Sequence, residues 1–324
     1  MQTMDVERRR HQMARGYEIV RAAQLRVLGY LPPEQHPSRL ERLRRKLEFQ
    51  FLRYYAGGVP HWRLALRQYG GRRTLPDFCV IGPIKSGTSD LATSLLLHPN
   101  VMAPLTKELP AHALDPESWR LFYPTEAEKR QHAARHGVAL SPYLSPYLHF
   151  LELAHQVARR LPNAKVVIPL RDPAERFYSH WKWEVFMSGR QRALQLPFLA
   201  TFPAYVDKAL EAFPDCTMYT RVGAQPLQTS IYWQSVREWI SAMGEQNVLV
   251  LDISEYFRER AGFMRKIHDF VGLPAVTMPA LTGVINENPL RLPPADPHSM
   301  AKLREFFRPR NDKLWEVIGK RFDW

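Results

Sequence analysis

A glycine-containing turn that carries a lysine and several hydroxyl side chains follows the apolar run at residues 78–82. The turn reads Gly-Pro-Ile-Lys-Ser-Gly-Thr-Ser over residues 82–89, and a helical pattern of leucines follows it. A turn of this kind before a helix directs backbone N–H groups and the positive end of the helix dipole toward one point. Lys85 adds a full charge, and Thr88 and Ser89 add hydroxyl donors. The segment is therefore predicted to bind a phosphate or a similar anion.

The position of the lysine separates this turn from the Walker A loop of nucleotide kinases and ATPases. In that loop the lysine follows the last glycine and precedes Ser or Thr, whereas Lys85 stands two residues before Gly87. A kinase would also need a magnesium-binding acid after a later strand, a position that Asp252 occupies. The spacing favours phosphate binding without kinase chemistry, and a nucleotide kinase or other phosphotransferase is the alternative enzyme.

A second anion site is predicted where the apolar run 165–170 ends at Arg171. Asp172 and Pro173 suit the N-cap and the first position of a following helix. Ser179 lies six residues beyond Pro173, about 9 Å along that helix. An arginine fork and a serine hydroxyl can share one phosphate. Open α/β sheets bind ligands at the carboxyl ends of their strands, so both anion sites are expected at the same sheet edge.

These residues resemble the sulfotransferase superfamily that uses 3′-phosphoadenosine-5′-phosphosulfate (PAPS). The family's 5′-phosphosulfate loop has the form I-G-x-x-K-x-G-T-T-x-L, and this chain has IGPIKSGTSDL, with Ser89 in place of the second Thr. The family's 3′-phosphate element, L-R-[ND]-P-x-x-R-x-x-S, matches LRDPAERFYS throughout. SPYL at residues 141–144 and the C-terminal segment LREFFRPRNDKLWEVIGKRFDW are similar to the heparan- and chondroitin-type carbohydrate branch. The resemblance covers residues 77–324.

The resemblance implies a P-loop-NTPase-like, three-layer α/β fold with a central parallel sheet. It implies transfer of a sulfuryl group from PAPS, without a metal, to a hydroxyl or less readily an amine of an acceptor. A carbohydrate, a glycosylated metabolite or a small alcohol would serve as acceptor. Arg171 and Ser179 would bind the 3′-phosphate, and Arg291 in a late loop would close over the nucleotide. The residues implied to bind the 5′-phosphosulfate are Lys85, Ser86, Gly87, Thr88 and Ser89.

The same resemblance indicates a catalytic base. The carbohydrate branch has K-E-P-H-F-F with its Glu as the base, and Lys107-Glu108 matches the first pair. The sequence then departs, because Leu109 separates Glu from Pro and no double Phe follows. Glu108 is the first candidate for the base, and His112 is the second because a neutral imidazole accepts a proton near pH 7. Lys85 is the candidate for stabilising charge on the leaving group.

Short apolar runs that alternate with helical patterns must position these side chains. Strands are expected at residues 78–82, 138–140, 165–170 and 248–252, with helices between them. Such alternation is typical of βαβ crossovers and of a parallel sheet covered on both faces. Pro169 is expected near the end of its strand, because proline cannot donate a hydrogen bond to the sheet.

Residues 1–72 are expected to form a basic helical extension, and residues 73–324 the sulfotransferase domain. Ser38 and Glu41 form a capping box, leucines follow at helical spacing, and the glycines at 57–58 can close that helix. Two interpretations of the extension stay open. It either packs on the domain or forms an amphipathic arm that contacts a membrane surface or a partner.

The composition adds a strong positive balance. The 324 residues include 45 Lys+Arg and 32 Asp+Glu, a formal net charge of +13. This charge keeps a non-enzymatic nucleic-acid or polyanion binding protein as the alternative from another class. Two cysteines exclude a disulfide framework, and His132 and His136 lack a third partner for a metal. Without a secretory signal or a long apolar stretch, a cytoplasmic protein is expected.

Overall fold

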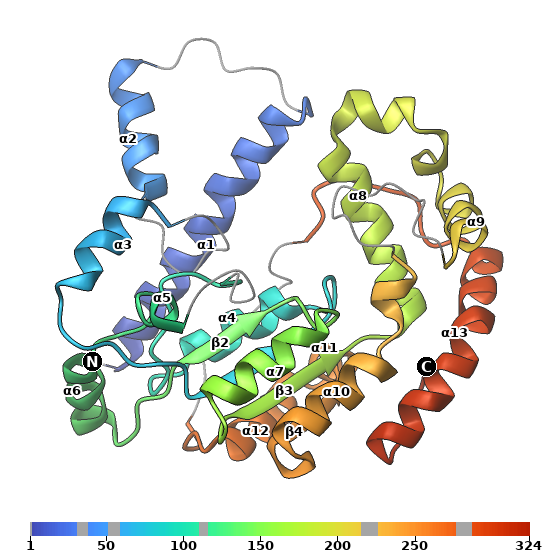
Figure 1. The fold of residues 1–324 in the computed structure, drawn as a ribbon. Coiled ribbons are helices and arrows are strands. Elements are labelled where there is room, and N and C mark those ends of the chain that lie inside the picture. The colour runs from blue at the N-terminus through green and yellow to red at the C-terminus, as the bar shows by residue number, and fades with distance from the viewer. Residues whose placement is uncertain (1, 31–37, 51–58, 110–115, 215–225, 277–286) are drawn as a thin grey trace.

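A four-stranded parallel sheet lies at the centre of the part of the chain that the structure describes (Figure 1). The structure is a computed structural model and describes residues 2–30, 38–50, 59–109, 116–214, 226–276 and 287–324. The strand order is β2-β1-β3-β4, and every neighbouring pair is parallel. The strands are β1 (Phe78–Ile81), β2 (Pro142–Ser145), β3 (Lys165–Leu170) and β4 (Val248–Asp252).

Three of the four strands lie where the apolar runs predict them, and the second does not. The expected strand at 138–140 is wrong, since within it Leu140 makes only an isolated bridge to Val101. The strand that pairs with β1 begins two residues later, at Pro142. A proline is tolerated at the first position of an edge strand. Pro169 lies one residue before the end of β3 and beyond the last β1–β3 pair at Val167, as expected.

Alternate residues of the strands face two different helical layers. Phe78 and Val80 pack with the apolar faces of α4, α11 and α12, whereas Cys79 and Ile81 pack with α7, α10 and the end of α13. This period of two is what a sheet buried on both faces requires. Figure 1 shows α7 and α10 in front of the sheet. The three-layer α/β fold is therefore confirmed. The layers contain α4 (Thr88–Leu97), α11 (Ile253–Arg258), α12 (Arg260–Val271), α7 (Leu151–Arg160), α10 (Trp233–Met243) and α13 (Pro297–Ile318).

A separate apolar cluster joins α8 (Pro173–Gln195), α9 (Phe202–Ala212) and α13 at one side of the sheet. The Asp172 side chain accepts a hydrogen bond from the Ala174 N–H at 2.9 Å, and Pro173 is the first helical residue, so the predicted start of α8 is confirmed. Gly189 interrupts α8 with φ of 79°. Two further helices, α5 (Pro116–Arg120) and α6 (Glu126–His136), precede β2 in the chain.

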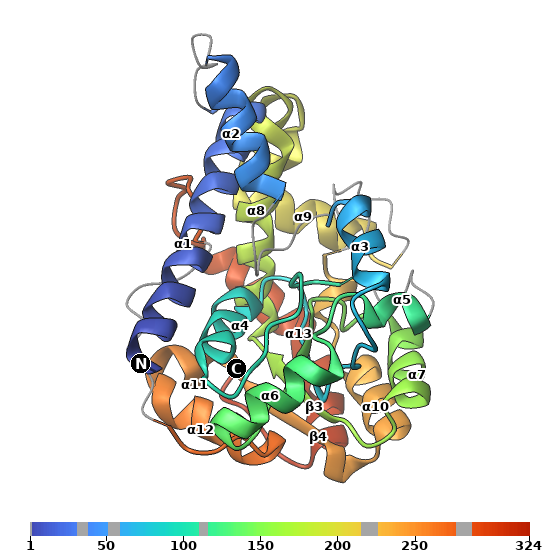
Figure 2. The same cartoon turned by 90° about the vertical axis from the view of Figure 1, so that its left-hand side faces the viewer.

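The N-terminal region forms α1 (Gln2–Val27), α2 (Arg39–Gln50) and α3 (His61–Gln68). Helix α1 packs along α4, with Met13 buried in the core on that side of the sheet (Figure 2). The Glu41 N–H donates to the Ser38 hydroxyl at 3.2 Å, which confirms the predicted cap, while the glycines at 57–58 lie outside the described residues. Helix α2 exposes its leucines, including Leu40 at 79%. Packing on the domain is thus observed for α1, and contact of the arm with a membrane surface stays a prediction.

Two buried histidines are expected to make the stability of the fold depend on pH. Burial lowers the pKa of His180 to about 4, and burial with repulsion from His98 does the same for His268. An unfolded chain titrates these groups near 6.5, so below that pH the unfolded state binds more protons than the folded state. The free energy of unfolding should therefore fall as the pH drops from about 6.5 to 4, by at most roughly 3 kcal/mol per histidine.

Urea unfolding at pH 7 and pH 5 measures this effect. The variant His268→Gln should lose less stability on acidification than the parent chain. His298→Gln, which changes an exposed histidine, controls for the loss of any imidazole. Equal acid sensitivity of His268→Gln and the parent chain would contradict the assignment to His268.

Candidate active site

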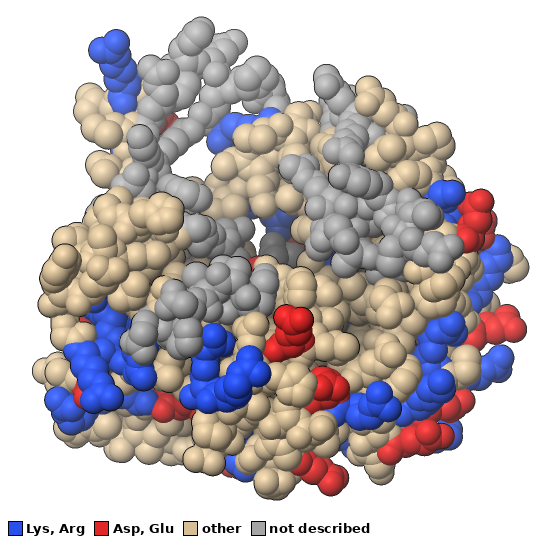
Figure 3. Space-filling view, viewed as in Figure 1, with Lys and Arg blue, Asp and Glu red and all other residues tan. Residues whose placement is uncertain are grey.

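A cavity of about 370 Å³ lies at the carboxyl edge of the sheet. The segments that follow β1, β2 and β3 reach it, since Lys85, Pro146 and Arg171 are among its lining residues. Helices α1 and α8 add further lining, and Figure 3 shows a hollow between the parts of the surface that they form. The lining residues include Tyr17, Arg21, Gln24, Ile84, Lys85, Gly87, Thr88, Ser89, Asp90, Lys107, Glu108, Pro146, Arg171, Ser179, Lys182, Trp183, Phe186, Met187, Phe257, Glu287 and Asn288.

Two glycines shape the turn between β1 and α4. A Cβ atom at Gly82 would lie 2.6 Å from Thr88 Cγ2, so no larger residue fits where the turn folds back on the helix. Gly87 is the N-cap of α4 and has φ of 74°, a conformation that costs glycine little. The turn therefore delivers the first residues of α4, with the N–H groups that a helix leaves unsatisfied there, to the cavity.

Lys85 lies in this turn with a strained backbone and in a crowd of positive charges. Its φ is 71°, and among the described residues only Glu108 is another non-glycine with positive φ. Burial is the main cause that lowers the pKa of the Lys85 ammonium to about 7. Repulsion from three neighbouring cations, Arg21, Arg171 and Lys182, adds to this effect. Strain and uncompensated charge are typical of a functional site.

The hydroxyl residues of the turn divide into two groups. Thr88 and Ser89 line the cavity. Ser86 is buried and its hydroxyl donates to the Pro83 carbonyl oxygen at 2.6 Å, so its side chain closes the turn. The predicted roles of these residues as ligands of the 5′-phosphosulfate stay predictions.

The second predicted anion site lies beside the first. Arg171 Nη1 donates to the Lys85 carbonyl oxygen at 3.4 Å, and Arg171 Nη2 lies 3.6 Å from the Glu175 carboxylate. Ser179 lines the cavity one turn and a half into α8. Further residues of α8 at helical spacing continue the same wall: Lys182, Trp183, Phe186 and Met187. The structure thus brings the two basic segments together at one sheet edge.

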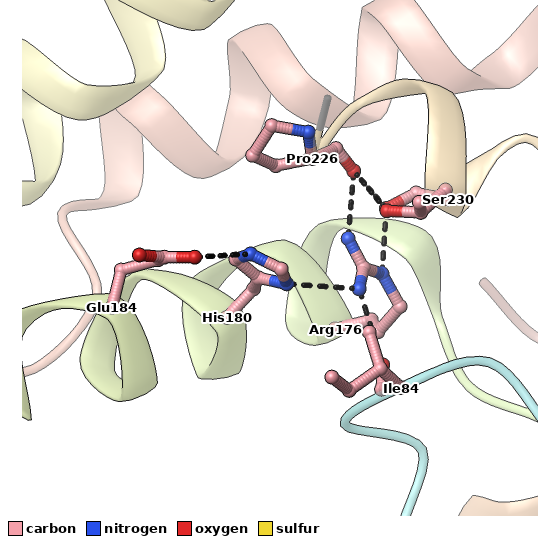
Figure 4. A network of polar contacts seen from close by, with 7 residues as sticks. Ile84, Arg176, His180, Glu184, Pro226 and Ser230 are labelled. Atoms are coloured by element: carbon pink, nitrogen blue, oxygen red, sulfur yellow. Dashed lines mark hydrogen bonds and ion pairs between the residues drawn. The ribbon is translucent and has the colours of Figure 1, made fainter. Parts of the chain in front are cut away.

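A buried arginine that the sequence reasoning did not single out holds the turn against α8 (Figure 4). Arg176 is fully buried, and its guanidinium donates to the Ile84 carbonyl at 3.1 Å and to the Pro226 carbonyl at 2.6 Å. It also donates to the Ser230 hydroxyl at 2.7 Å and approaches His180. Arg176 is the second arginine of LRDPAERFYS, but the motif alone does not show that it faces inward.

The candidate base Glu108 lines the same cavity and lies on the segment that precedes α5 in the chain. Glu108 has φ of 58°, its N–H donates to the Leu144 carbonyl at 3.0 Å, and its carboxylate contacts the Lys107 ammonium. Burial lowers the pKa of the Lys107 ammonium, but Glu108, Tyr17 and Tyr147 together outweigh burial and raise that pKa overall. Lys107 therefore stays charged and orients Glu108. The second candidate, His112, lies outside the described residues.

The late loop contributes to the cavity through residues other than the predicted arginine. Glu287 and Asn288 line the cavity, and Asn288 Nδ2 donates to the Lys182 carbonyl at 2.6 Å. Arg291 is exposed and is not among the lining residues. The Asn288 side chain also accepts a hydrogen bond from the Leu290 N–H at 2.9 Å, which closes a turn just before Arg291.

The two histidines at helical spacing lie apart from this site. The rings of His132 and His136 are 4.5 Å apart, and His132 Nε2 is 2.7 Å from the Pro99 carbonyl oxygen. Among the residues that the structure describes, no third His, Cys, Asp or Glu joins them as a cluster.

The donor set of the cavity fits a molecule with two anionic ends. The lining includes five basic residues and three acidic ones. Glu108 is engaged by Lys107, and Asp90 accepts from the Tyr256 hydroxyl at 2.6 Å and from Arg260 at 3.1 Å. An excess of positive charge therefore faces the space next to Lys85 and Arg171, and charge-assisted hydrogen bonds to phosphate or sulfate would relieve it.

Comparison with known families assigns the chain. Residues 75–288 match the sulfotransferase domain. The chain belongs to the sulfotransferase family. The match includes both anion-binding segments and Glu108, whereas α1, α2 and Arg291 lie outside it. The resemblance seen in the sequence is thus confirmed, and the family speaks against a nucleotide kinase.

Named relatives agree with the carbohydrate branch of the sulfotransferases. The chain is 23% identical to carbohydrate sulfotransferase 15 of Homo sapiens, over 78% of this chain and 55% of that protein. It is 24% identical to human heparan sulfate glucosamine 3-O-sulfotransferase 3A1, over 82% of this chain and 66% of that protein. The chain therefore spans about half the length of the first of these relatives. A sulfotransferase from Alicyclobacillus acidocaldarius has the same fold, with a TM-score of 0.56 and 22% identity over 77% of this chain and 98% of that one.

The sulfotransferase relatives also correct the expected location. Carbohydrate and heparan sulfate sulfotransferases of this kind are membrane enzymes of the Golgi, so the expectation of a cytoplasmic protein is wrong. No helix among the described residues is long and apolar enough to cross a membrane.

Proposed function

We propose that the protein is a PAPS-dependent sulfotransferase that sulfates a hydroxyl group of a carbohydrate acceptor. The observation that carries the proposal is the meeting of Lys85 and Arg171 at one sheet edge, in a chain that belongs to the sulfotransferase family. Two cationic sites side by side suit a nucleotide that is phosphorylated at both ends. The match to the family's loop and 3′-phosphate element supports the assignment of one site to each end.

PAPS supplies an activated sulfuryl group whose leaving group is adenosine 3′,5′-bisphosphate. In the transfer an acceptor oxygen forms a bond to sulfur, the bond from sulfur to the 5′-phosphate oxygen breaks, and the acceptor proton passes to a base. The leaving phosphate oxygen takes the electron pair of the broken bond. Catalysis of this kind rests on positioning and on stabilisation of charge, as in phosphoryl transfer.

The residues of the cavity provide these functions. Lys85 would stabilise charge on the leaving oxygen, and the hydroxyls of Thr88 and Ser89 with the start of α4 would hold the 5′ end. Arg171 and Ser179 would hold the 3′-phosphate. Glu108 would take the proton from the acceptor.

The acceptor is proposed from the lining and from the relatives. Trp183 is a partly exposed aromatic residue that lines the cavity beside polar side chains, which suits the apolar face and the hydroxyls of a sugar. The printed names of the matched relatives are those of carbohydrate and heparan sulfate sulfotransferases. These observations favour a sugar hydroxyl over a small alcohol.

Calorimetric titration separates this proposal from its rivals. Adenosine 3′,5′-bisphosphate should bind at micromolar to low millimolar concentration, more tightly than ATP. A polyanion-binding protein would instead bind duplex DNA with a steep dependence on salt and show no preference for the bisphosphate. Absence of binding at millimolar adenosine 3′,5′-bisphosphate would overturn the proposed function.

Arg171→Ala is expected to remove the preference for a 3′-phosphate. The parent chain should bind adenosine 3′,5′-bisphosphate about tenfold to a hundredfold more tightly than adenosine 5′-phosphate, because a charge-assisted contact contributes about 1.5–3 kcal/mol. In the variant the two affinities should become similar. The same titration with Arg304→Ala, an exposed arginine on α13, provides the control. An unchanged ratio in Arg171→Ala would place the 3′-phosphate elsewhere.

A further inference from the structure

The wall of the cavity that faces away from the sheet comes from α1, a helix that lies outside the sulfotransferase match. Tyr17, Arg21 and Gln24 line the cavity. They follow each other at intervals of four and three residues, so they share one face of the helix. Met13, one turn earlier on this face, is buried against α4.

Contacts at both ends hold α1 in place. The Met13 side chain is 3% exposed and packs in the cluster that contains the leucines of α4. Beyond the other end, the Tyr30 hydroxyl donates to the Val185 carbonyl of α8 at 2.8 Å, and its ring stacks on Phe186 with centroids 5.7 Å apart. A Cβ atom at Gly189 would lie 3.1 Å from the Leu28 carbonyl oxygen, so the backbones meet closely there. The cavity-facing side chains of α1 are therefore presented by a docked helix.

Tyr17 faces the turn and the candidate base at the same time. It lines the cavity together with Ser89, Lys107 and Glu108. Burial raises the pKa of the Tyr17 hydroxyl, and the nearby Lys107 ammonium opposes that rise. The side chain thus lies between the segment assigned to the 5′-phosphosulfate and the segment assigned to the base. This position places α1 next to the reacting atoms of the proposed transfer.

Arg21 lies one turn further along and reaches the space near Lys85. Its guanidinium carbon lies 5.2 Å from the centroid of the Phe186 ring, and Nη2 donates to the Glu287 carbonyl oxygen at 2.9 Å. Arg21 is the first of the three cations that repel the Lys85 ammonium. A guanidinium that lines the cavity beside Lys85 can bind an anionic oxygen through charge-assisted hydrogen bonds. It also joins α1 to the late loop, which is where Arg291 was expected to act.

We propose that Arg21 binds the 5′ end of the sulfuryl donor and takes the place predicted for Arg291. The proposal rests on the proposed function, because it assigns a further residue of the same site. It makes α1 a part of the catalytic unit, so the predicted boundary at residue 72 would separate segments that share one site. Arg21 and Arg171 would then contact opposite ends of the same nucleotide.

The two ends can be told apart by titrating each variant with adenosine 3′,5′-bisphosphate and with adenosine 5′-phosphate. Arg21→Ala should weaken the binding of both ligands by about tenfold to a hundredfold and leave their ratio unchanged. Arg171→Ala should instead change the ratio. Arg21→Lys should recover part of the affinity, because the charge remains and the planar fork is lost.

Two variants test whether a loss of affinity in Arg21→Ala comes from a lost contact with the ligand or only from a less firmly packed α1. Arg15→Ala removes an exposed arginine from the same helix, and Tyr30→Phe removes the hydrogen bond to Val185 without touching the cavity lining. Both should bind the ligands like the parent chain. Parent-like affinity of Arg21→Ala, or an equal loss in Tyr30→Phe, would overturn the role of Arg21. Failure of the parent chain to bind either ligand would instead overturn the proposed function.

Discussion

Lys85→Ala is expected to lower the rate of sulfuryl transfer by about a hundredfold to a thousandfold, the usual effect of removing one preorganised group that stabilises developing charge. The factor by which the transfer rate falls should exceed the factor by which affinity for adenosine 3′,5′-bisphosphate falls, because the charge on the leaving oxygen grows during the reaction. Transfer from labelled PAPS and calorimetry measure the two quantities. Lys266→Ala, which removes a surface lysine paired with Glu255, should change neither.

The depressed pKa of Lys85 gives this prediction a second measurement. The ammonium of the free protein titrates at about 7, because it is buried and repelled by neighbouring cations. An anionic ligand favours the charged form and raises that pKa. Above pH 7, binding should therefore take up as much as one proton, and affinity should decline as the pH rises from 7 to 9.

Calorimetry at pH 8 in buffers of different ionisation enthalpy counts that proton. Lys85→Arg is the matched variant, because an arginine keeps its proton throughout this range and should abolish the uptake while it retains part of the affinity. Proton uptake that is equal in Lys85→Arg and in the parent chain would show that another group titrates. Transfer at the parent rate in Lys85→Ala would remove Lys85 from the mechanism.

The sequence predicted the parts of the fold that depend on local apolar pattern. The runs that form β1, β3 and β4 are fully apolar over four or five residues. The run at 138–140 has the same appearance, whereas β2 contains Pro142 and Ser145. Which segment pairs with a strand depends on the whole sheet and not only on the residues of that segment. The local apolar pattern therefore predicted the wrong position for the second strand.

The sequence predicted site residues in turns that directly follow strands, such as Lys85 and Arg171, and residues that match family motifs, such as Ser179 and Glu108. Lys85 and Arg171 come together because both follow parallel strands of one sheet, a rule that can be applied to a sequence. Arg21 and Arg176 could not be found in this way. Arg21 belongs to a helix whose docking against α8 depends on distant contacts, and Arg176 has the same side chain as Arg171 but points into the core.

The structure shows where part of the net charge of +13 lies. Five basic residues line the cavity. Among them, Arg21, Arg171 and Lys182 each repel the Lys85 ammonium, and Arg171 also repels Lys182. On the face seen in Figure 3, basic side chains alternate with acidic ones over α10 and α13. Basic side chains also gather at the lower left of that view. Part of the positive charge therefore lies in the cavity and part on the surface.

Glu108 is the other residue on which the proposed mechanism depends, and its backbone conformation is unusual. Lys85 and Glu108 are the two non-glycine residues with positive φ among those described. Such strain costs of the order of 1–3 kcal/mol and persists where the surroundings impose it. Here the hydrogen bond from the Glu108 N–H to β2 and the contact with the buried Lys107 hold the residue. Glu108 thereby lines the cavity, in which the proposed mechanism places the acceptor hydroxyl.

Glu108→Gln is expected to lower transfer by about a hundredfold to ten-thousandfold while affinity for adenosine 3′,5′-bisphosphate stays within about threefold of the parent value. The amide has the shape of the carboxylate but cannot take up a proton, and general base catalysis contributes a factor of this size. Transfer is measured with labelled PAPS and the sugar that reacts fastest in a screen of acceptors. His112→Ala, tested beside it, should retain most of its activity. If Glu108→Gln keeps more than a tenth of the rate and His112→Ala does not, the proton passes to His112, and Glu108 serves only to hold Lys107.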